Sequence, residues 1–149
     1  MELPVGLRHV FAETRLYADE REYVVVSMPL TALYDGTAML AKMGEPFSVA
    51  VVDKDELTLV FPRDVWDVAR DALDWADEAL GYRLITFDVS VELGLVGYIA
   101  TLINVVAEAG VSLLVFSAYQ RDHLLVLEED FDRAWAALTT FIDSCQDES

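Results

Sequence analysis

Cysteine and histidine are scarce in this sequence, and their scarcity excludes several kinds of chemistry. Cys145 is the only cysteine among 149 residues, so the chain cannot form an intramolecular disulfide or a cysteine-based metal cage. The two histidines, His9 and His123, stand in no sequence context that marks a base for a serine nucleophile. The acidic residues and histidines form no cluster with the spacing of metal ligands. We therefore expect a protein that is not an enzyme and that holds neither a metal nor a cofactor.

Basic residues and long hydrophobic runs are also few. The chain has 10 basic and 27 acidic residues, and its formal net charge of −17 repels nucleic-acid phosphates and anionic lipid headgroups. The longest nearly uncharged stretch, residues 93–107, is shorter than the roughly 20 residues that cross a bilayer. The N-terminus lacks a basic region followed by an apolar segment and a cleavage site of small residues. We expect a cytoplasmic protein that binds neither nucleic acid nor a membrane.

The second half of the chain alternates between two apolar periodicities. Segments rich in β-branched and aromatic residues favour strands, and apolar residues three and four positions apart favour helices. Gly110 is placed to stop the first helix, and Asp130 is placed to cap the start of the second. The polar residues 120–122 suit the loop of a hairpin. The predicted elements, in the order β-α-β-β-α, are residues 82–91, 95–110, 111–119, 123–129 and 131–145.

The first half repeats this order less regularly. A strand over 21–29 ends at a proline, and the stretch 30–44 is either a weak helix or a loop broken at Gly36. A hairpin over 47–61 has its turn at residues 53–55. Residues 62–81 begin with a proline, end with a glycine and carry an apolar stripe, which predicts a strong amphipathic helix. Residues 1–20 are ambiguous, with an extra strand at "TRLYA" as one interpretation.

These patterns predict an α+β fold with two ferredoxin-like β-α-β-β-α units in tandem. The N-terminal unit spans residues 1–81 and the C-terminal unit 82–149, and we expect them to pack as one compact body because no Ser/Gly-rich linker separates them. This arrangement hosts many unrelated functions, so function has to be argued from sites. The Cys-x-x-Cys loop of metallochaperones, the basic sheet residues of RNA-recognition modules and the loop arginine of acylphosphatases are all missing.

The turn between the strand over 82–91 and the helix over 95–110 has two glycines. In "VELGLVGYI", Gly94 and Gly97 bracket a segment where the backbone can approach a ligand and where the helix points free N–H groups outward. A carboxylate could bind there. Alternatively, Gly97 lets the helix pack tightly on the sheet, and the sequence leaves both interpretations open.

Three stretches of the sequence resemble a known family. "LVGYIATL" (95–102) and "SAYQRDHLLV" (117–126) are similar to the helix start and the hairpin of the small tandem ACT-domain proteins, and "DKDELTLVFP" (53–62) resembles a stretch in the first half of those proteins. The CASTOR-type cytosolic arginine sensors belong to the same group. The resemblance covers roughly residues 22–142, and its most specific part is the hairpin.

The resemblance implies a non-catalytic regulatory protein that binds a small molecule, usually an amino acid, between paired ACT domains. Carried over by position, Val96 and Gly97 offer backbone groups to a carboxylate. Ser117, Ala118 and Asp122 line the facing side, and Asp122 is available to pair with an ammonium or guanidinium group.

The sequence departs from the family's hairpin at four positions. Where that motif has Thr, Asp, Thr and Tyr, this chain has Ala118, Gln120, Arg121 and His123. Three of these replacements change polarity or charge where the side chain of a ligand would reach, so the family's ligand does not carry over. Asp122 and His123 stand on adjacent positions of a strand and point to opposite faces, which argues against a catalytic pair.

Two functions are compatible with these observations. The first is an amino-acid sensor of the ACT type that acts through a homodimer or a partner protein. The alternative is a structural or protein-interaction module that keeps the fold without a ligand, since apolar segments such as "YVVVSM" (23–28) favour pairing between chains.

Overall fold

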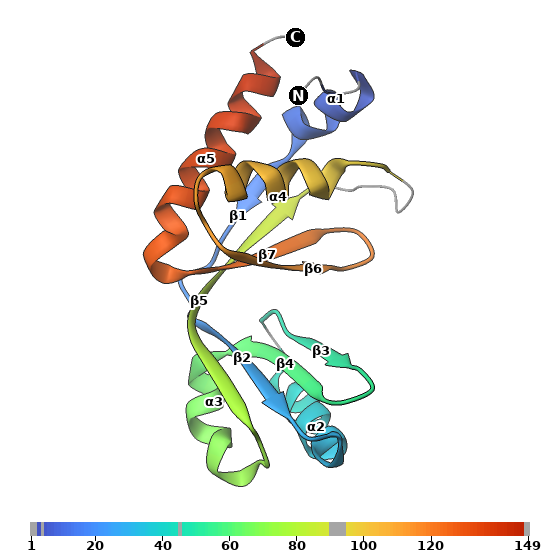
Figure 1. Ribbon diagram of the computed structural model, residues 1–149, viewed down its shortest axis with the longest axis vertical. Helices are drawn as coiled ribbons and strands as arrows, with labels where there is room; N and C mark the ends of the chain where they lie inside the picture. Colours follow the sequence, from blue (N-terminus) through green and yellow to red (C-terminus); the bar gives the residue numbers. More distant parts are fainter. Residues whose placement is uncertain (1–2, 4, 45, 90–94, 148–149) are drawn as a thin grey trace. The chain divides into compact units, whose positions relative to one another are not determined.

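The computed structural model describes residues 3, 5–44, 46–89 and 95–147, and their contacts divide the chain into two units (Figure 1). The central unit is Glu20–Tyr82. The terminal unit combines Met1–Asp19 with Arg83–Ser149. One strand, β5 (Asp77–Asp88), begins in the central unit and ends in the terminal unit.

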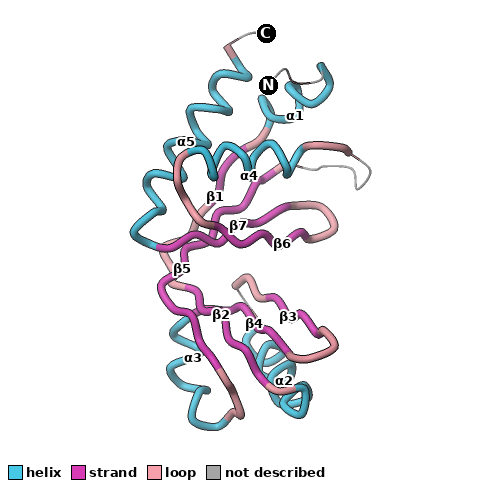
Figure 2. Tube along the Cα trace, viewed as in Figure 1, coloured by secondary structure: helices cyan, strands magenta, loops and turns pink. Residues whose placement is uncertain are grey.

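The central unit is a four-stranded antiparallel sheet with helices on one face (Figure 2). Its strands follow the spatial order β3-β4-β2-β5, in which each hairpin or crossover matches the ferredoxin-like topology. The elements are β2 (Tyr23–Met28), η1 (Leu30–Ala32), α2 (Leu33–Met43), β3 (Val49–Val52), β4 (Leu57–Pro62), α3 (Arg63–Ala69), η2 (Arg70–Ala72) and the first half of β5. The predicted strand at 21–29 and the hairpin with its turn at 53–55 are confirmed.

The core of the central unit lies between this sheet and its helices. Alternate residues of β2 and β4 point to the helical face, as the two-residue period of a strand requires, and Trp66 of α3 covers them. All of these side chains are at most 1% exposed: Val24, Val26, Met28, Leu57, Leu59, Phe61 and Trp66.

Helix α2 is continuous, so the break expected at Gly36 is wrong. Gly36 serves the packing of the helix on the sheet instead. A Cβ atom at this position would lie 3.1 Å from side-chain atoms of both Leu57 and Leu59 and 3.2 Å from the sulfur of Met28. Because Gly36 has no side chain, α2 can lie this close to β4. Glycine destabilises the helix itself, and the packing contact offsets that effect.

The long helix predicted over 62–81 is also wrong. Helix α3 ends at Ala69, η2 follows, and β5 begins at Asp77. The apolar stripe is only partly buried, because Val65 and Leu73 pack on the core whereas Val68 is 86% exposed. Strand β5 pairs with β2, so the local helical pattern gives way to hydrogen bonds with a distant strand.

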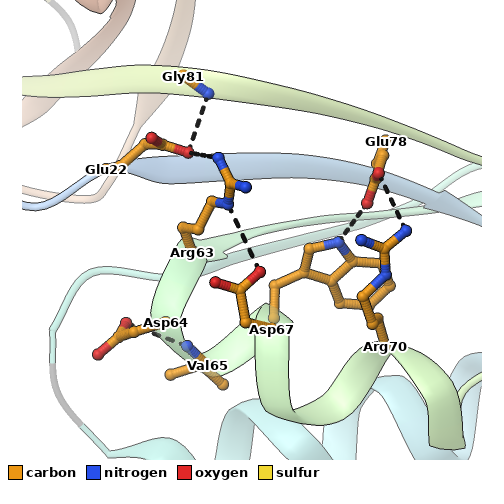
Figure 3. Close-up of polar contacts among 9 residues, drawn as sticks. Glu22, Arg63, Asp64, Val65, Asp67, Arg70, Glu78 and Gly81 are labelled. Atoms are coloured by element: carbon orange, nitrogen blue, oxygen red, sulfur yellow. Dashed lines mark hydrogen bonds and ion pairs between the residues drawn. The ribbon is translucent and has the colours of Figure 1, made fainter.

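Polar contacts fix the start of β5 against α3 and β2 (Figure 3). Glu78 accepts a hydrogen bond of 2.6 Å from the indole of Trp66 and forms an ion pair of 3.1 Å with Arg70. Glu22 forms an ion pair of 2.8 Å with Arg63 and accepts a 3.3 Å hydrogen bond from the backbone N–H of Gly81. Glu78 therefore connects β5 to α3 and η2. Glu22 connects α3 to the chain just before β2 and also holds β5 there.

The terminal unit contains residues from both ends of the chain. Its elements are α1 (Val5–Glu13), β1 (Arg15–Tyr17), the second half of β5, α4 (Tyr98–Glu108), β6 (Leu113–Ser117), β7 (Asp122–Leu127) and α5 (Glu128–Gln146). The strand order is β1-β5-β7-β6. Strand β1 pairs with β5 from Arg15↔Asp88 to Tyr17↔Thr86, so the N-terminal segment supplies the fourth strand of this sheet. The strand considered at "TRLYA" is confirmed.

This topology differs from the expected division of the chain at residues 81 and 82. The junction between the units lies at Tyr82 and Arg83, but residues 1–19 pack with residues 83–149 because β1 and α1 complete that unit. Helix α1 has no counterpart among the expected elements.

The other elements of the terminal unit follow the sequence patterns closely. The helix predicted over 95–110, both hairpin strands and the last helix are confirmed. Helix α5 begins two residues before Asp130, and its N-cap position is Leu127, so the capping role of Asp130 is wrong. Of the strand expected over 82–91, residues 90 and 91 lie outside the described residues. Helices α1, α4 and α5 cover one face of the sheet, and the core between them includes Phe11 of α1, Phe87 of β5 and Leu124 of β7.

Candidate functional site

The first candidate feature is the N-terminus of α4. Gly97 occupies its N-cap position with φ = 92°, in the left-handed region that favours glycine. Among the described residues, a Cβ atom here would have only Leu7 within 4 Å, at 3.5 Å. The glycine is therefore explained by its backbone conformation, and tight packing of the helix on the sheet does not require it. Val96 is 86% exposed, and Gly94 lies outside the described residues.

Within the described part of the chain, no side chain caps the start of α4. The side chain and the backbone N–H of Thr101 both donate to the carbonyl of Gly97, at 2.8 and 3.1 Å, and these bonds fix the first turn. The first N–H groups of the helix point away from that turn and carry the positive end of the helix dipole, which suits a carboxylate.

The second feature is the β6–β7 hairpin. Ser117 and Asp122 are directly opposite each other at the loop end of the ladder, and the serine hydroxyl donates a 2.5 Å hydrogen bond to the Asp122 carboxylate. The backbone N–H of Ala118 donates to the carbonyl of Arg121 at 2.8 Å and closes the turn. The loop is therefore 118–121, and Asp122, expected in the loop, is the first residue of β7.

Tyr98 connects the hairpin to the helix start. It is the first residue of α4, is 2% exposed, and its hydroxyl lies 2.8 Å from that of Thr14. Burial raises the pKa of Tyr98 to about 12; the hydrogen bond with Thr14 opposes this effect, and the negative charge of Asp122 adds a smaller contribution in the same direction as burial. The structure thus brings Asp122 within electrostatic reach of the residue that follows Gly97.

His123 faces away from this cluster. Its Nδ1 lies 2.9 Å from the hydroxyl of Thr86 on β5, and burial lowers its pKa. Asp122 instead contacts Ser117, so the adjacent acid and histidine serve opposite faces of the sheet, as expected for neighbours on a strand. Arg121, a departure from the ACT hairpin pattern, forms a 2.9 Å ion pair with Asp88.

The resulting arrangement combines a helix N-terminus, a carboxylate and a small hydroxyl. Of the five expected site residues, Ser117 and Asp122 contact each other directly, Gly97 precedes Tyr98 at the start of α4, and Val96 and Ala118 are exposed. Sequence patterns missed Tyr98 and Thr14, because a contact between residues 84 positions apart leaves no local signal. Among the described residues, no group of three His, Cys, Asp or Glu side chains could hold a metal ion.

A ferredoxin-like unit with this helix start and hairpin belongs to a recognised class of domain. Residues 79–140 match the family model of the ACT domain. The match extends from β5 into α5 and includes both parts of the candidate site. Residues 79–140 are therefore similar to an ACT domain.

Comparison with solved structures extends the similarity to most of the chain, whereas no curated protein matches it. Protein VC0802 of Vibrio cholerae, described as a protein of unknown function and possible transport protein, is 27% identical, with a TM-score of 0.70 over 91% of this chain and 95% of that one. Protein Atu0741 of Agrobacterium tumefaciens is 20% identical, with a TM-score of 0.67 over 87% and 89% of the two chains.

The fold also resembles that of a solved regulatory subunit. The ligand-free regulatory subunit of aspartate kinase from Thermus thermophilus has a TM-score of 0.62 over 86% of this chain and 97% of that one. At 12% identity this likeness shows the fold alone, and it is a likeness to a regulatory subunit, not to a catalytic domain. No helix in the described ranges has the length and apolar character needed to span a membrane.

Proposed function

We propose that this protein is an ACT-type regulatory module whose terminal unit binds an amino acid. The carboxylate of the ligand binds the first N–H groups of α4 beside Gly97, and its ammonium or guanidinium group pairs with Asp122. The observation that carries this proposal is the position of Asp122, which is hydrogen-bonded to Ser117 and acts electrostatically on Tyr98 at the start of the helix.

Charge complementarity supports a ligand with two opposite charges. The positive end of the α4 dipole favours an anionic group, and Asp122 favours a cationic one through a charge-assisted hydrogen bond. The net charge of −17 disfavours ligands that carry only negative groups. A zwitterionic amino acid meets both conditions, and the residues Val96 and Ala118 are exposed beside the proposed site.

We further propose that the protein acts as a homodimer. Strand β6 ends the path of hydrogen-bonded strands, so its outer edge has no strand partner within the described chain. This edge strand is apolar, and Leu114 on it is 37% exposed. An apolar edge of this kind favours pairing with a second copy.

A thermal-shift screen of the twenty amino acids tests the ligand. A ligand present at about 100 times its Kd is expected to stabilise the protein by about 2.7 kcal/mol. Asp122→Asn should abolish the shift. The matched control Asp132→Asn removes the same charge from the exposed face of α5 and should keep it. Absence of any shift from a dimer verified by light scattering would reject the ligand, and a full shift in the Asp122 variant would reject the role of that residue.

One observation favours the alternative of a ligand-free interaction module. The hydrogen bond from Ser117 already satisfies one oxygen of Asp122 without a ligand. In that case Asp122→Asn changes only local stability, and the dimer forms through its apolar edge whatever amino acid is present. Light scattering alongside the thermal screen separates the two functions.

A further inference from the structure

Helices α2 and α3 of the central unit border an open groove of about 690 Å³. The groove is lined mainly by apolar side chains, among them Ala38, Met39, Met43, Val65, Val68 and Leu73. Three charged residues, Asp35, Lys42 and Asp64, lie along it. All of these residues belong to the central unit, so the groove is separate from the site at α4 and β7.

Two large apolar side chains at the groove are strongly exposed. Tyr34 is 82% exposed on α2, and Val68 is 86% exposed on α3. Single exposed apolar residues are ordinary, but an apolar groove with exposed apolar residues on both of its helices is typical of an interaction surface.

In the terminal unit, the two helices that cover the sheet are themselves contacted by a third helix, α1. There, α1 packs on the layer formed by α4 and α5. Its Phe11 is fully buried, stacked on Tyr98 of α4 with ring centroids 5.0 Å apart and in edge contact with Phe141 of α5 at 5.1 Å. Leu7, one helical turn earlier, is 4% exposed. A short helix with large apolar residues at positions i and i+4 therefore completes that layer.

The central unit has no such third helix. Within residues 20–44 and 46–82 the only α-helices are α2 and α3, and α3 has 7 residues where α5 has 19. The groove is the space that remains between a full-length helix and a short one.

We propose that this groove binds an amphipathic helix of a partner protein, with large apolar residues at i and i+4 and basic residues beside them. The apolar lining takes the anchor residues, as the surface of α4 and α5 takes Leu7 and Phe11. The charges along the groove are two carboxylates, Asp35 and Asp64, against Lys42 alone, so a basic flank complements them.

The same charges disfavour a second copy of this chain as the occupant. A two-fold interface places the same patch on both sides, so it would bring together four carboxylates, Asp35 and Asp64 of each copy, with only the two Lys42 side chains to neutralise them. A basic helix from another protein avoids this excess of negative charge.

A designed peptide tests the proposal with a defined probe. The probe has about 18 residues, leucines at helical spacing and lysines elsewhere, and a scrambled peptide of the same composition is its control. At about 0.15 M salt, where long-range attraction is screened, the amphipathic peptide should bind at least about tenfold more tightly than the scrambled one. Equal binding of the two peptides overturns the proposal.

Methionine methyl NMR locates the bound peptide. Met39 and Met43 line the groove, whereas Met28 is 1% exposed in the core of the same unit and serves as an internal reference. The signals of Met39 and Met43 should shift on titration and that of Met28 should shift least. If the signals of Met39 and Met43 do not shift, the peptide binds elsewhere and the proposal is overturned.

Matched substitutions complete the test. Tyr34→Asp and Val68→Asp each place a charge at the groove and should weaken binding at least about fivefold. Tyr119→Asp changes a tyrosine that is 77% exposed in the hairpin loop of the terminal unit, and it should leave binding unchanged. Equal effects of the three variants overturn the proposal. So does light scattering in which Tyr34→Asp converts a wild-type dimer into a monomer, since the groove is then an interface between copies.

Discussion

The hydroxyl groups of Thr14 and Tyr98 lie 2.8 Å apart, although the two residues are 84 positions apart in the chain. Thr14 also donates to the carbonyl of Val10 at 2.9 Å, so it accepts the hydrogen bond of the tyrosine. This contact attaches the end of α1 to the first residue of α4. The N-terminal segment is thereby coupled to the helix start at which we place the carboxylate of the ligand.

Tyr98→Phe is expected to destabilise the protein by about 1 kcal/mol at neutral pH, because Thr14 loses its donor in a buried position. Urea denaturation monitored by tryptophan fluorescence measures the change. The control Tyr119→Phe removes the hydroxyl of an exposed tyrosine and should stay within about 0.5 kcal/mol of wild type. Equal stability of wild type and Tyr98→Phe would show that the hydrogen bond contributes nothing net.

The pKa of Tyr98 predicts a difference between wild type and Tyr98→Phe at alkaline pH. Burial raises this pKa from 10.0 to about 12, so the unfolded chain releases the phenolic proton at a lower pH than the folded chain. The contribution of Tyr98 to stability is complete below pH 10 and is lost between pH 10 and about 12. The stability gap between wild type and Tyr98→Phe should narrow over this range, and parallel curves would contradict the shift.

Glu78 is the residue on which the start of β5 depends most. Glu78→Ala leaves the indole N–H of fully buried Trp66 without its acceptor and Arg70 without its ion pair, and the expected cost is about 1–3 kcal/mol. Asp67→Ala is the control, since Asp67 forms an exposed 3.5 Å pair with Arg63 and should matter by less than about 0.5 kcal/mol. Similar denaturation midpoints for the two variants would refute the role of Glu78.

The parts of the fold that the sequence predicts correctly are those fixed by local chemistry. The turn at 53–55 is one, because the carboxylate of Asp53 accepts hydrogen bonds of 2.8 Å from the backbone N–H groups of both Asp55 and Glu56. The helix that starts after Gly97 and the β6–β7 hairpin are others; Ser117 lies on its predicted strand, although Asp122 begins β7 and does not belong to the loop. In each case the signal and the structure lie within a few residues of each other.

The parts that sequence patterns miss depend on distant partners. Residues 73–81 have helix-forming residues with helical spacing, yet residues 77–82 pair with β2, more than 50 positions earlier in register pairs such as Val26↔Glu78. Strand β1 likewise gains its place only through its pairing with β5. The contact between Tyr98 and Thr14 could not be predicted for the same reason, because the two residues are 84 positions apart. Sequence patterns alone therefore identify only part of the candidate site.

His123 predicts how stability changes on the acidic side. Burial lowers its pKa below 6.5; nearby Asp122 opposes this effect and Arg121 adds to it. The unfolded chain therefore takes up the proton first, and stability that is complete above pH 6.5 falls as the pH drops below it. His123→Gln should reduce this loss in melts compared at about pH 7 and pH 5.5, whereas His9→Gln, which changes an exposed residue, should retain it. Identical slopes in the two variants would contradict the assignment.

The substitution Gly36→Ala tests how closely α2 must lie on the sheet. Alanine favours a helix over glycine by about 0.5–1 kcal/mol, but its Cβ would meet Leu57, Leu59 and Met28 at 3.1–3.2 Å in a packed core. We expect crowding to prevail and Gly36→Ala to destabilise by about 1–3 kcal/mol in urea denaturation. Gly6→Ala in α1 is the matched control, since the added methyl group would meet no neighbour within 4 Å and the change should be neutral or mildly stabilising. If Gly36→Ala were as stable as wild type, α2 could move off the sheet without loss, and its close contact with β4 would not define the core.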